Sequence, residues 1–413
     1  MTATNRRSGP PAIPLALFGA PPDFSTPIPL QRPHYGHREA ILAQVDGMLD
    51  GGEALVEEFE ARIASAVDAA HCVAVSNTGA AMELAVRGLG LGGEVILPAF
   101  MPVVAAHTLA RLGITPVFCD IDARTRTLDP QKARTLVTPR TTGIIAAHLW
   151  GQPCHVAALE ELARDRGLKL LFDARHAFGC TRGGRPVGAY GDAEVFGFDA
   201  ANPLYACDGA AITTGDAALA RRLRIIQNLG FDDAGASVCL GIEARMNPVC
   251  AAMGLANLEQ VHDFIEINRR HVARYDLQLA DLAGIVVAAD EPMDQRNFQQ
   301  AVVEVDQAAA GLSRDALLAV LHAEGVRATR DYYPGSHRVE PYRIPNPEAW
   351  LRLQATERLA ERVLCLPGGA AADESAIDRI CEIVRCAVKH AAAIMAHLSP
   401  PARRGLPRPD RRR

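Results

Sequence analysis

Lysine is almost missing from this chain, which has three lysines among its 43 basic residues. Because so few amines are present, each lysine can be considered in turn as a catalytic nucleophile. The ten cysteines include no CxxC pair, and no Cys/His spacing matches a zinc site. We therefore expect reduced cysteines, no metal centre and a cytoplasmic protein.

Long apolar runs and an excess of positive charge are also lacking. No run approaches the roughly 20 apolar residues that a membrane-spanning helix needs. The formal net charge is −5, so no overall basic field favours nucleic acid. Hydrophobic residues make up 49% of the chain and charged residues 22%, which is typical of a globular protein with a large core. The composition therefore favours neither a membrane nor a nucleic acid as a partner.

Short apolar runs alternate with amphipathic helical stretches through the first half of the chain. This alternation is typical of an α/β protein whose mostly parallel sheet is covered on both faces. Seven strands are expected, at 72–75, 94–97, 116–120, 142–147, 169–173, 193–198 and 210–214. A strongly helical stretch from Met246 to Arg274 then leads into a region whose pattern of strands and helices is typical of a small α+β domain.

The sequence predicts four segments. They are a flexible, proline-rich arm at 1–35, a large domain at 36–260, a small C-terminal domain at 261–398 and a basic disordered tail at 399–413.

Polar residues gather where two of the expected strands end. Thr78 and Gly79 lie in a strand-to-helix turn, whose backbone N–H groups can bind an anion, although such turns also occur without any function. Asp173 ends a buried strand and His176 follows it, and strand ends are where parallel sheets bind ligands. A capping Asp and a packed His would explain that pair equally well.

The order of motifs resembles the DegT/StrS-type sugar aminotransferases, a branch of the fold-type I pyridoxal-phosphate (PLP) enzymes. The resemblance covers about residues 35–390 and implies that family's PLP-transferase fold. The motifs that carry it include Ser76-Asn-Thr-Gly, Glu94-Val-Ile-Leu-Pro-Ala-Phe, His148-Leu-Trp-Gly-Gln-Pro, Asp173-Ala-Arg-His-Ala-Phe-Gly, Gly188-Ala-Tyr-Gly-Asp and Tyr332-Tyr-Pro.

The resemblance implies a role for each matching residue. Asp173 would pair with the pyridine nitrogen of PLP and keep the ring an electron sink. His176 would contact the phenolic oxygen of the ring, and Thr78 and Gly79 would contact the phosphate. A homodimer with sites shared between subunits is also implied.

Four positions depart from the family pattern. Asn202 stands where the family has the lysine that forms the Schiff base, and an amide can neither form an imine nor act as a base. Gly197 replaces a phosphate-binding serine, Pro102 replaces an aromatic residue that covers the ring, and Glu243 replaces an asparagine that reaches the phosphate from the neighbouring subunit. None of Lys132, Lys169 and Lys389 is expected near this site.

Three hypotheses follow. In the first, the protein binds no cofactor covalently and catalyses a PLP-independent acid/base step, such as an elimination, cyclisation or condensation. The substrate would be a small polar metabolite of amino-sugar or specialised-metabolite biosynthesis. Its catalytic residues would be His176, Asp173 and Asn202, and its substrate-binding residues would be Arg245, His337, Glu243 and Asp208.

In the second hypothesis, PLP or pyridoxamine phosphate (PMP) binds noncovalently, and the protein is a sugar aminotransferase or dehydratase with His176 as the base. In the third, the protein is a noncatalytic subunit that pairs with an active paralogue in a heterodimer.

Overall fold

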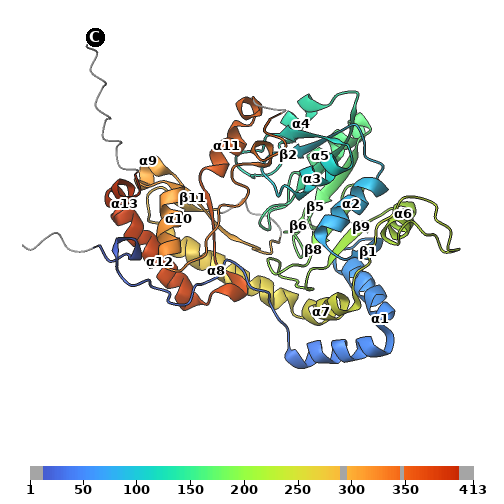
Figure 1. The fold of residues 1–413 in the computed structure, drawn as a ribbon, viewed down its shortest axis with the longest axis horizontal. Helices are drawn as coiled ribbons and strands as arrows, with labels where there is room; N and C mark the ends of the chain where they lie inside the picture. The colour runs from blue at the N-terminus through green and yellow to red at the C-terminus, as the bar shows by residue number, and fades with distance from the viewer. Residues whose placement is uncertain (1–12, 289–294, 345–347, 400–413) are drawn as a thin grey trace, which may run out of the picture.

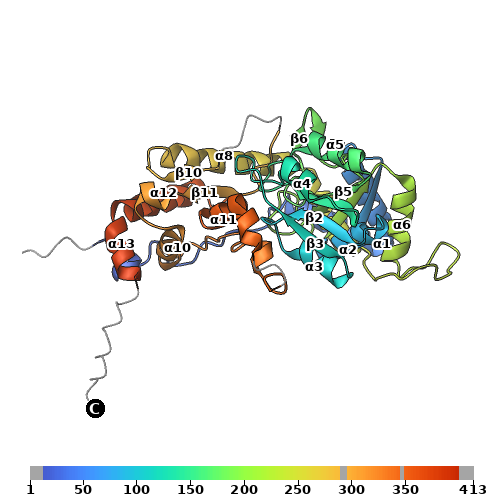
Figure 2. The same ribbon diagram turned by 90° about the horizontal axis from the view of Figure 1, so that it is seen from above.

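The computed structural model describes residues 13–288, 295–344 and 348–399. Two lobes lie side by side, a large domain that contains the main sheet and a smaller C-terminal domain (Figures 1 and 2). Almost all of the predicted basic tail, residues 400–413, lies outside the described residues, as do the first 12 residues of the predicted arm.

The main sheet has seven strands in the order β1-β9-β8-β5-β4-β2-β3. Only β9 runs antiparallel to its neighbours, so the predicted mostly parallel seven-stranded sheet is confirmed. The strands are β1 (His71–Val75), β2 (Glu94–Pro98), β3 (Thr115–Cys119), β4 (Thr141–Ala147), β5 (Lys169–Asp173), β8 (Ala193–Gly197) and β9 (Ala210–Thr214).

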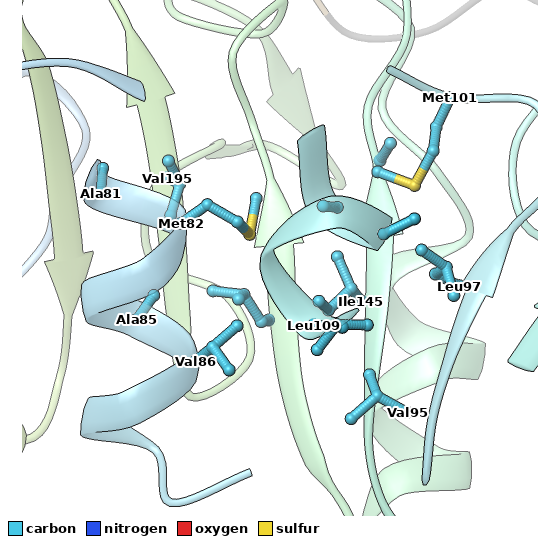
Figure 3. Packing of buried hydrophobic residues seen from close by; sticks show 14 of the residues in the cluster. Ala81, Met82, Ala85, Val86, Val95, Leu97, Met101, Leu109, Ile145 and Val195 are labelled. Atoms are coloured by element: carbon cyan, nitrogen blue, oxygen red, sulfur yellow. The ribbon is translucent and has the colours of Figure 1, made fainter. Parts of the chain in front are cut away.

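Side chains of successive strand residues enter two separate cores, one on each face of the sheet. In β2, for example, Val95 and Leu97 join one core and Ile96 the other, as the alternation of a strand requires. Figure 3 shows α2 and α3 packed over the first face, with Met82 and Leu109 pointing at the strands.

Helices cover both faces of the sheet. The first face carries α2 (Thr78–Gly88), α3 (Val104–Arg111) and α6 (Ala217–Gln227). The second face carries α1 (Arg38–Ala66), α4 (Pro130–Leu136), α5 (Val156–Arg166) and α7 (Pro248–Leu258). A two-stranded ribbon, β6 (Thr181–Arg182) with β7 (Arg185–Pro186), follows β5.

The small domain is built on a three-stranded antiparallel sheet. Its strands are β10 (Ile285–Val287), β11 (Ala301–Val305) and β12 (Val363–Leu366). Its helices are α8 (Val261–Leu279), α9 (Gln307–Ala310), α10 (Arg314–Ala323), α11 (Gln354–Ala360), α12 (Glu374–Lys389) and α13 (Ala391–Leu398). Short 3₁₀ turns are η2 (Ser336–Arg338), η3 (Ala349–Arg352) and η4 (Gly369–Ala371).

The helix predicted to begin at Met246 is two helices in the structure. Asn247 caps α7 by accepting a hydrogen bond from the Val249 N–H, and α7 begins at Pro248, where the missing N–H costs nothing. Residues 259–260 then separate α7 from α8.

Residues 13–35, which we call the N-terminal segment, pack on the small domain rather than forming a loose arm. The segment contains η1 (Ala16–Phe18), and its Leu15 and Phe24 side chains are buried in the small-domain core. The Glu324 carboxylate accepts hydrogen bonds from the Ala16 and Asp23 N–H groups at 2.6 and 2.9 Å. Figure 1 shows the blue segment beside α12 and α13. The flexible arm expected from composition is therefore not what the structure has at 13–35.

No helix within the described ranges is long and apolar enough to cross a membrane. Since β1, β8, β5, β4, β2 and β3 all run in one direction, their carboxyl ends share an edge of the sheet. That edge brings together Asp173, the turn after β1 and the end of β8.

Candidate functional site

Asp173 is the last residue of β5, and only 2% of its surface is exposed. Arg175, two residues later, binds both of its carboxylate oxygens. Nε donates to Oδ1 at 2.9 Å and Nη2 donates to Oδ2 at 2.7 Å, while the Arg175 backbone N–H donates to Oδ1 at 3.3 Å. The side chains form a bidentate ion pair, the strongest common geometry for arginine and carboxylate.

Burial and charge act in opposite directions on this pair. Burial by itself would raise the pKa of Asp173, but the Arg175 guanidinium outweighs it and holds that pKa below its usual value. For Arg175, burial would lower the pKa, and the Asp173 carboxylate raises it. Both groups are therefore ionised at neutral pH.

His176 lies next to this ion pair and is partly buried. Burial first, and then the positive charge of Arg175, lower the pKa of the imidazole, so the ring is neutral at pH 7. The Trp150 N–H donates to Nδ1 at 3.4 Å, which assigns the remaining proton to Nε2. Asn297 fixes the His176 backbone by donating to its carbonyl oxygen at 3.0 Å.

The turn after β1 is adjacent to the same group. Thr78 and Gly79 open α2, which Asn77 caps by accepting a hydrogen bond from Ala80 N–H at 2.9 Å. A Cβ built on Gly197, at the end of β8, would lie 2.8 Å from Thr78 Oγ1 and 3.1 Å from Arg175 Cγ. The structure thus brings together Thr78, Gly197 and Arg175, as the shared sheet edge predicts.

Three aromatic rings stand near the imidazole. Trp150, whose backbone binds His176, stacks on Tyr332 with ring centres 6.1 Å apart, and Phe100 packs against both rings. Tyr332 comes from the small domain, so this wall joins the two domains beside Asp173. Burial raises the pKa of the Tyr332 phenol well above its usual value, and the phenol stays protonated.

Asn202 is buried, and its partner Asp199 lies close enough to Arg175 and His176 to favour the charged form of each. Its Nδ2 donates to Asp199 Oδ1 at 3.1 Å, while its Oδ1 has no hydrogen-bond partner among the described residues. Asn202 lines a cavity between the two domains together with Gln299, His271 and His34, and neither Asp173 nor His176 lines it. The predicted catalytic role of Asn202 beside Asp173 and His176 stays a prediction.

The predicted substrate-binding residues are scattered. Glu243 and Arg245 are exposed and contact each other at 3.4 Å in a loop whose backbone pairs with Val75 and Ser76. Asp208 is exposed. Glu243 and Arg245 thus pair with each other beside the turn after β1.

His337 is buried away from Asp173. Its Nε2 hydrogen bonds to Glu357 Oε1 at 2.6 Å, and its ring packs against Phe118 at the end of β3. Strand β3 is three positions from β5, a separation of about 14 Å. His337 thus belongs to the contact between the domains, and its predicted role in binding an anionic group of a substrate stays a prediction.

Similarity to known proteins identifies the family of this chain. The family model described as the DegT/DnrJ/EryC1/StrS aminotransferase family matches residues 38–385. The chain belongs to this family. It also has the fold of the family's PLP-dependent aminotransferases.

Several members of the family are similar over most of the chain. GDP-perosamine synthase from Caulobacter vibrioides is 32% identical over 332 residues, which are 79% of this chain and 88% of that protein. A crystal structure of DesI in the presence of its TDP-sugar product is 42% identical and covers 92% of this chain and 98% of its own, with a TM-score of 0.88. The structure of S. venezuelae DesV in complex with a ketimine intermediate is 30% identical with a TM-score of 0.79, covering 85% and 95%.

All three lysines of this family member lie within the described residues, and each is placed away from Asp173. Lys132 Nζ binds Asp120 Oδ2 at 2.9 Å, near the end of β3. Lys169 binds Asp192 at 2.8 Å and begins β5, about 13 Å along the strand from Asp173. Lys389 is an exposed residue at the end of α12 in the small domain.

Arg175 is the site residue that the sequence analysis missed. It appears in the motif Asp173-Ala-Arg-His, but its side chain was given no role. A long cation two residues after a buried acid was the available signal, because a buried carboxylate requires a partner.

Proposed function

We propose that this protein is a member of the sugar aminotransferase family that does not transaminate. It would instead catalyse an acid/base step on a small polar metabolite, of the sugar-nucleotide type on which its relatives are named as acting. The observation that supports this proposal best is that no lysine amine lies near Asp173. In the proposed match to the family motif, Asn202 takes the position of the lysine.

The residues of the site do not fit covalently held PLP. An imine needs an amine, and the carboxylate that should receive the pyridine nitrogen already has a partner on each oxygen. A serine at position 197, the usual hydroxyl for the phosphate, would require Thr78 or Arg175 to move.

His176 is the residue best suited to the chemistry. Because its pKa is lowered, the ring is neutral and carries a proton on Nε2, with which it can hydrogen-bond to a substrate oxygen and polarise it. The Trp150 backbone N–H holds the ring in this tautomer. Asp173 would act through Arg175 rather than by binding a substrate amine, since neither of its oxygens is unpaired.

A second candidate is a sugar aminotransferase that holds its cofactor noncovalently. The names of the relatives favour it, because they include a perosamine synthase and a protein crystallised with a ketimine. Cofactor entry would require Arg175 to leave Asp173.

Cofactor retention and amino transfer separate the two candidates. The purified protein would be incubated with PLP or PMP, desalted and measured by absorbance, and then assayed with glutamate and keto-sugar nucleotides. We expect no retained chromophore and no amino transfer. Stoichiometric retention with enzymatic amino transfer would establish the second candidate and contradict ours.

A further inference from the structure

The ion pair between Arg175 and Asp173 carries an inference that rests on the proposed function and deepens it. In the family pattern, the acid at this position faces a protonated ring nitrogen. Here the chain itself supplies the cation, from a side chain two residues away on the same turn. The positive charge beside Asp173 is therefore permanent and needs no ligand.

Geometry shows how completely this cation satisfies the acid. Arg175 donates three hydrogen bonds to Asp173, counting its backbone N–H, and Asp173 is 2% exposed. A buried charge pair resists separation, because each ion left alone would keep its full desolvation cost. A ring nitrogen would have to displace the guanidinium from this contact.

The stem of Arg175 fills space as well. Its Cγ and Cδ lie 3.1 and 3.4 Å from the position of a Cβ on Gly197, whereas ordinary carbon contacts begin near 3.4 Å. Thr78 Oγ1 approaches the same position to 2.8 Å. Glycine at 197 and arginine at 175 therefore fit together, and a side chain at 197 is compatible only with movement of Arg175 or Thr78.

We propose that Arg175 is a built-in substitute for the cofactor, which pairs with Asp173 and closes the site to PLP independently of the residue at position 202. Two separate obstacles to PLP binding follow from this proposal. Without a lysine at position 202 no imine can form. In addition, Arg175 occupies the contact that the ring nitrogen would make with Asp173, and together with Gly197 it leaves no phosphate-binding serine, so restoring the lysine alone leaves this second obstacle in place.

A series of variants that restores the family residues step by step tests whether Arg175 excludes PLP. Asn202→Lys, Asn202→Lys with Arg175→Ala, and the triple variant with Gly197→Ser would each be incubated with PLP, reduced with borohydride and digested. Mass spectrometry then measures the fraction of position 202 that carries the pyridoxyl group. We expect little labelling of the single variant, and PLP binding about 100-fold tighter once Arg175→Ala is added.

Several outcomes would overturn the proposal. Labelling of Asn202→Lys equal to that of the double variant would show that Arg175 does not exclude the cofactor, although the proposed function of the natural chain would stand. Retention of PLP with amino transfer by the unaltered protein would refute the proposed function itself.

A double-mutant cycle keeps the proposal testable even where a variant folds poorly. Gly197→Ser should lower the melting temperature in the natural background, because the new side chain meets Arg175. In the Arg175→Ala background the same change should cost much less. Equal losses in both backgrounds would show that the two positions are independent, and the inferred fit between them would be wrong.

Discussion

The Asp120 carboxylate accepts hydrogen bonds from both the backbone N–H and the hydroxyl of Thr356, at 2.8 and 2.9 Å. Asp120 follows β3 of the large domain, and Thr356 lies in α11 of the small domain. One buried carboxylate thus holds the start of a helix from the other lobe, where its negative charge also complements the helix dipole. This contact is one of several that join the two domains near Asp173.

Replacing Asp120 should therefore weaken the whole protein. Asp120→Asn removes the charge that serves Thr356, Ala355 and Lys132 and leaves part of this network unpaired. We expect the free energy of unfolding to fall by about 2–3 kcal/mol, measured by urea denaturation. Asp165→Asn, at a half-exposed ion pair with Arg134, is the matched control and should cost less than about 0.5 kcal/mol.

The same substitution should have opposite effects in two helices. A Cβ on Gly254 in α7 would lie 2.4 Å from the buried ring of Phe59 in α1, so Gly254→Ala should destabilise the protein by about 1–3 kcal/mol. Gly47 in α1 has open space around it, and Gly47→Ala should stabilise its helix by up to about 1 kcal/mol. Thermal unfolding of both variants checks the difference in sign.

Acid should loosen the contact of His34 with α8. Burial lowers the pKa of His34 below 6.5, and the ring stacks on Phe264 and bonds to Asn268. Because the folded protein binds this proton less readily than the unfolded chain, the stability is complete above pH 6.5. It falls as the pH drops towards the folded pKa, by at most about 1.4 kcal/mol per pH unit for one proton.

His34→Phe keeps the stacking but cannot titrate. Its melting temperature should therefore fall less between pH 7.5 and pH 5.5 than that of the natural protein. His262→Gln, at an exposed position of α8, serves as the control and should leave the pH dependence unchanged. Identical pH profiles for all three proteins would show that His34 does not contribute.

Loss of the His176 imidazole should abolish most of the proposed activity. One hydrogen-bond donor aimed at a developing charge contributes about 10²–10³-fold, so His176→Ala should lower product formation in a reconstituted pathway by that factor. His262→Gln should have no effect. Unchanged turnover by His176→Ala, with a normal melting temperature, would remove this residue from the mechanism.

The sheet could be predicted well from the sequence, while the site could be predicted only in part. Strands such as 169–173 and 210–214 match to the residue, because alternating burial on two faces leaves a clear apolar pattern. The proximity of Asp173, His176 and the turn at Thr78 follows from the shared direction of their strands. The direction of the Asn202 side chain and the reach of Arg175 depend on side-chain packing across the fold, which periodicity does not encode.

The N-terminal segment was misjudged for a related reason. Its many prolines suggested a loose arm, but Leu15 and Phe24 find a core that other parts of the chain build. Phe24 also packs under the Arg379 guanidinium, 4.1 Å from its ring centre. Phe24→Ala should destabilise the protein by about 3 kcal/mol, which chemical denaturation can measure.

The bond from Ala16 to Glu324 spans 308 residues of sequence. During synthesis the N-terminal segment therefore leaves the ribosome long before the helices that receive it exist. Its apolar side chains cannot pack into the small-domain core until most of the polypeptide has been made, and until then they are exposed or bound by a chaperone. The C-terminal lobe is consequently a late-closing unit built from segments far apart in the sequence, and a fragment that begins at residue 261 would lack part of its own interior.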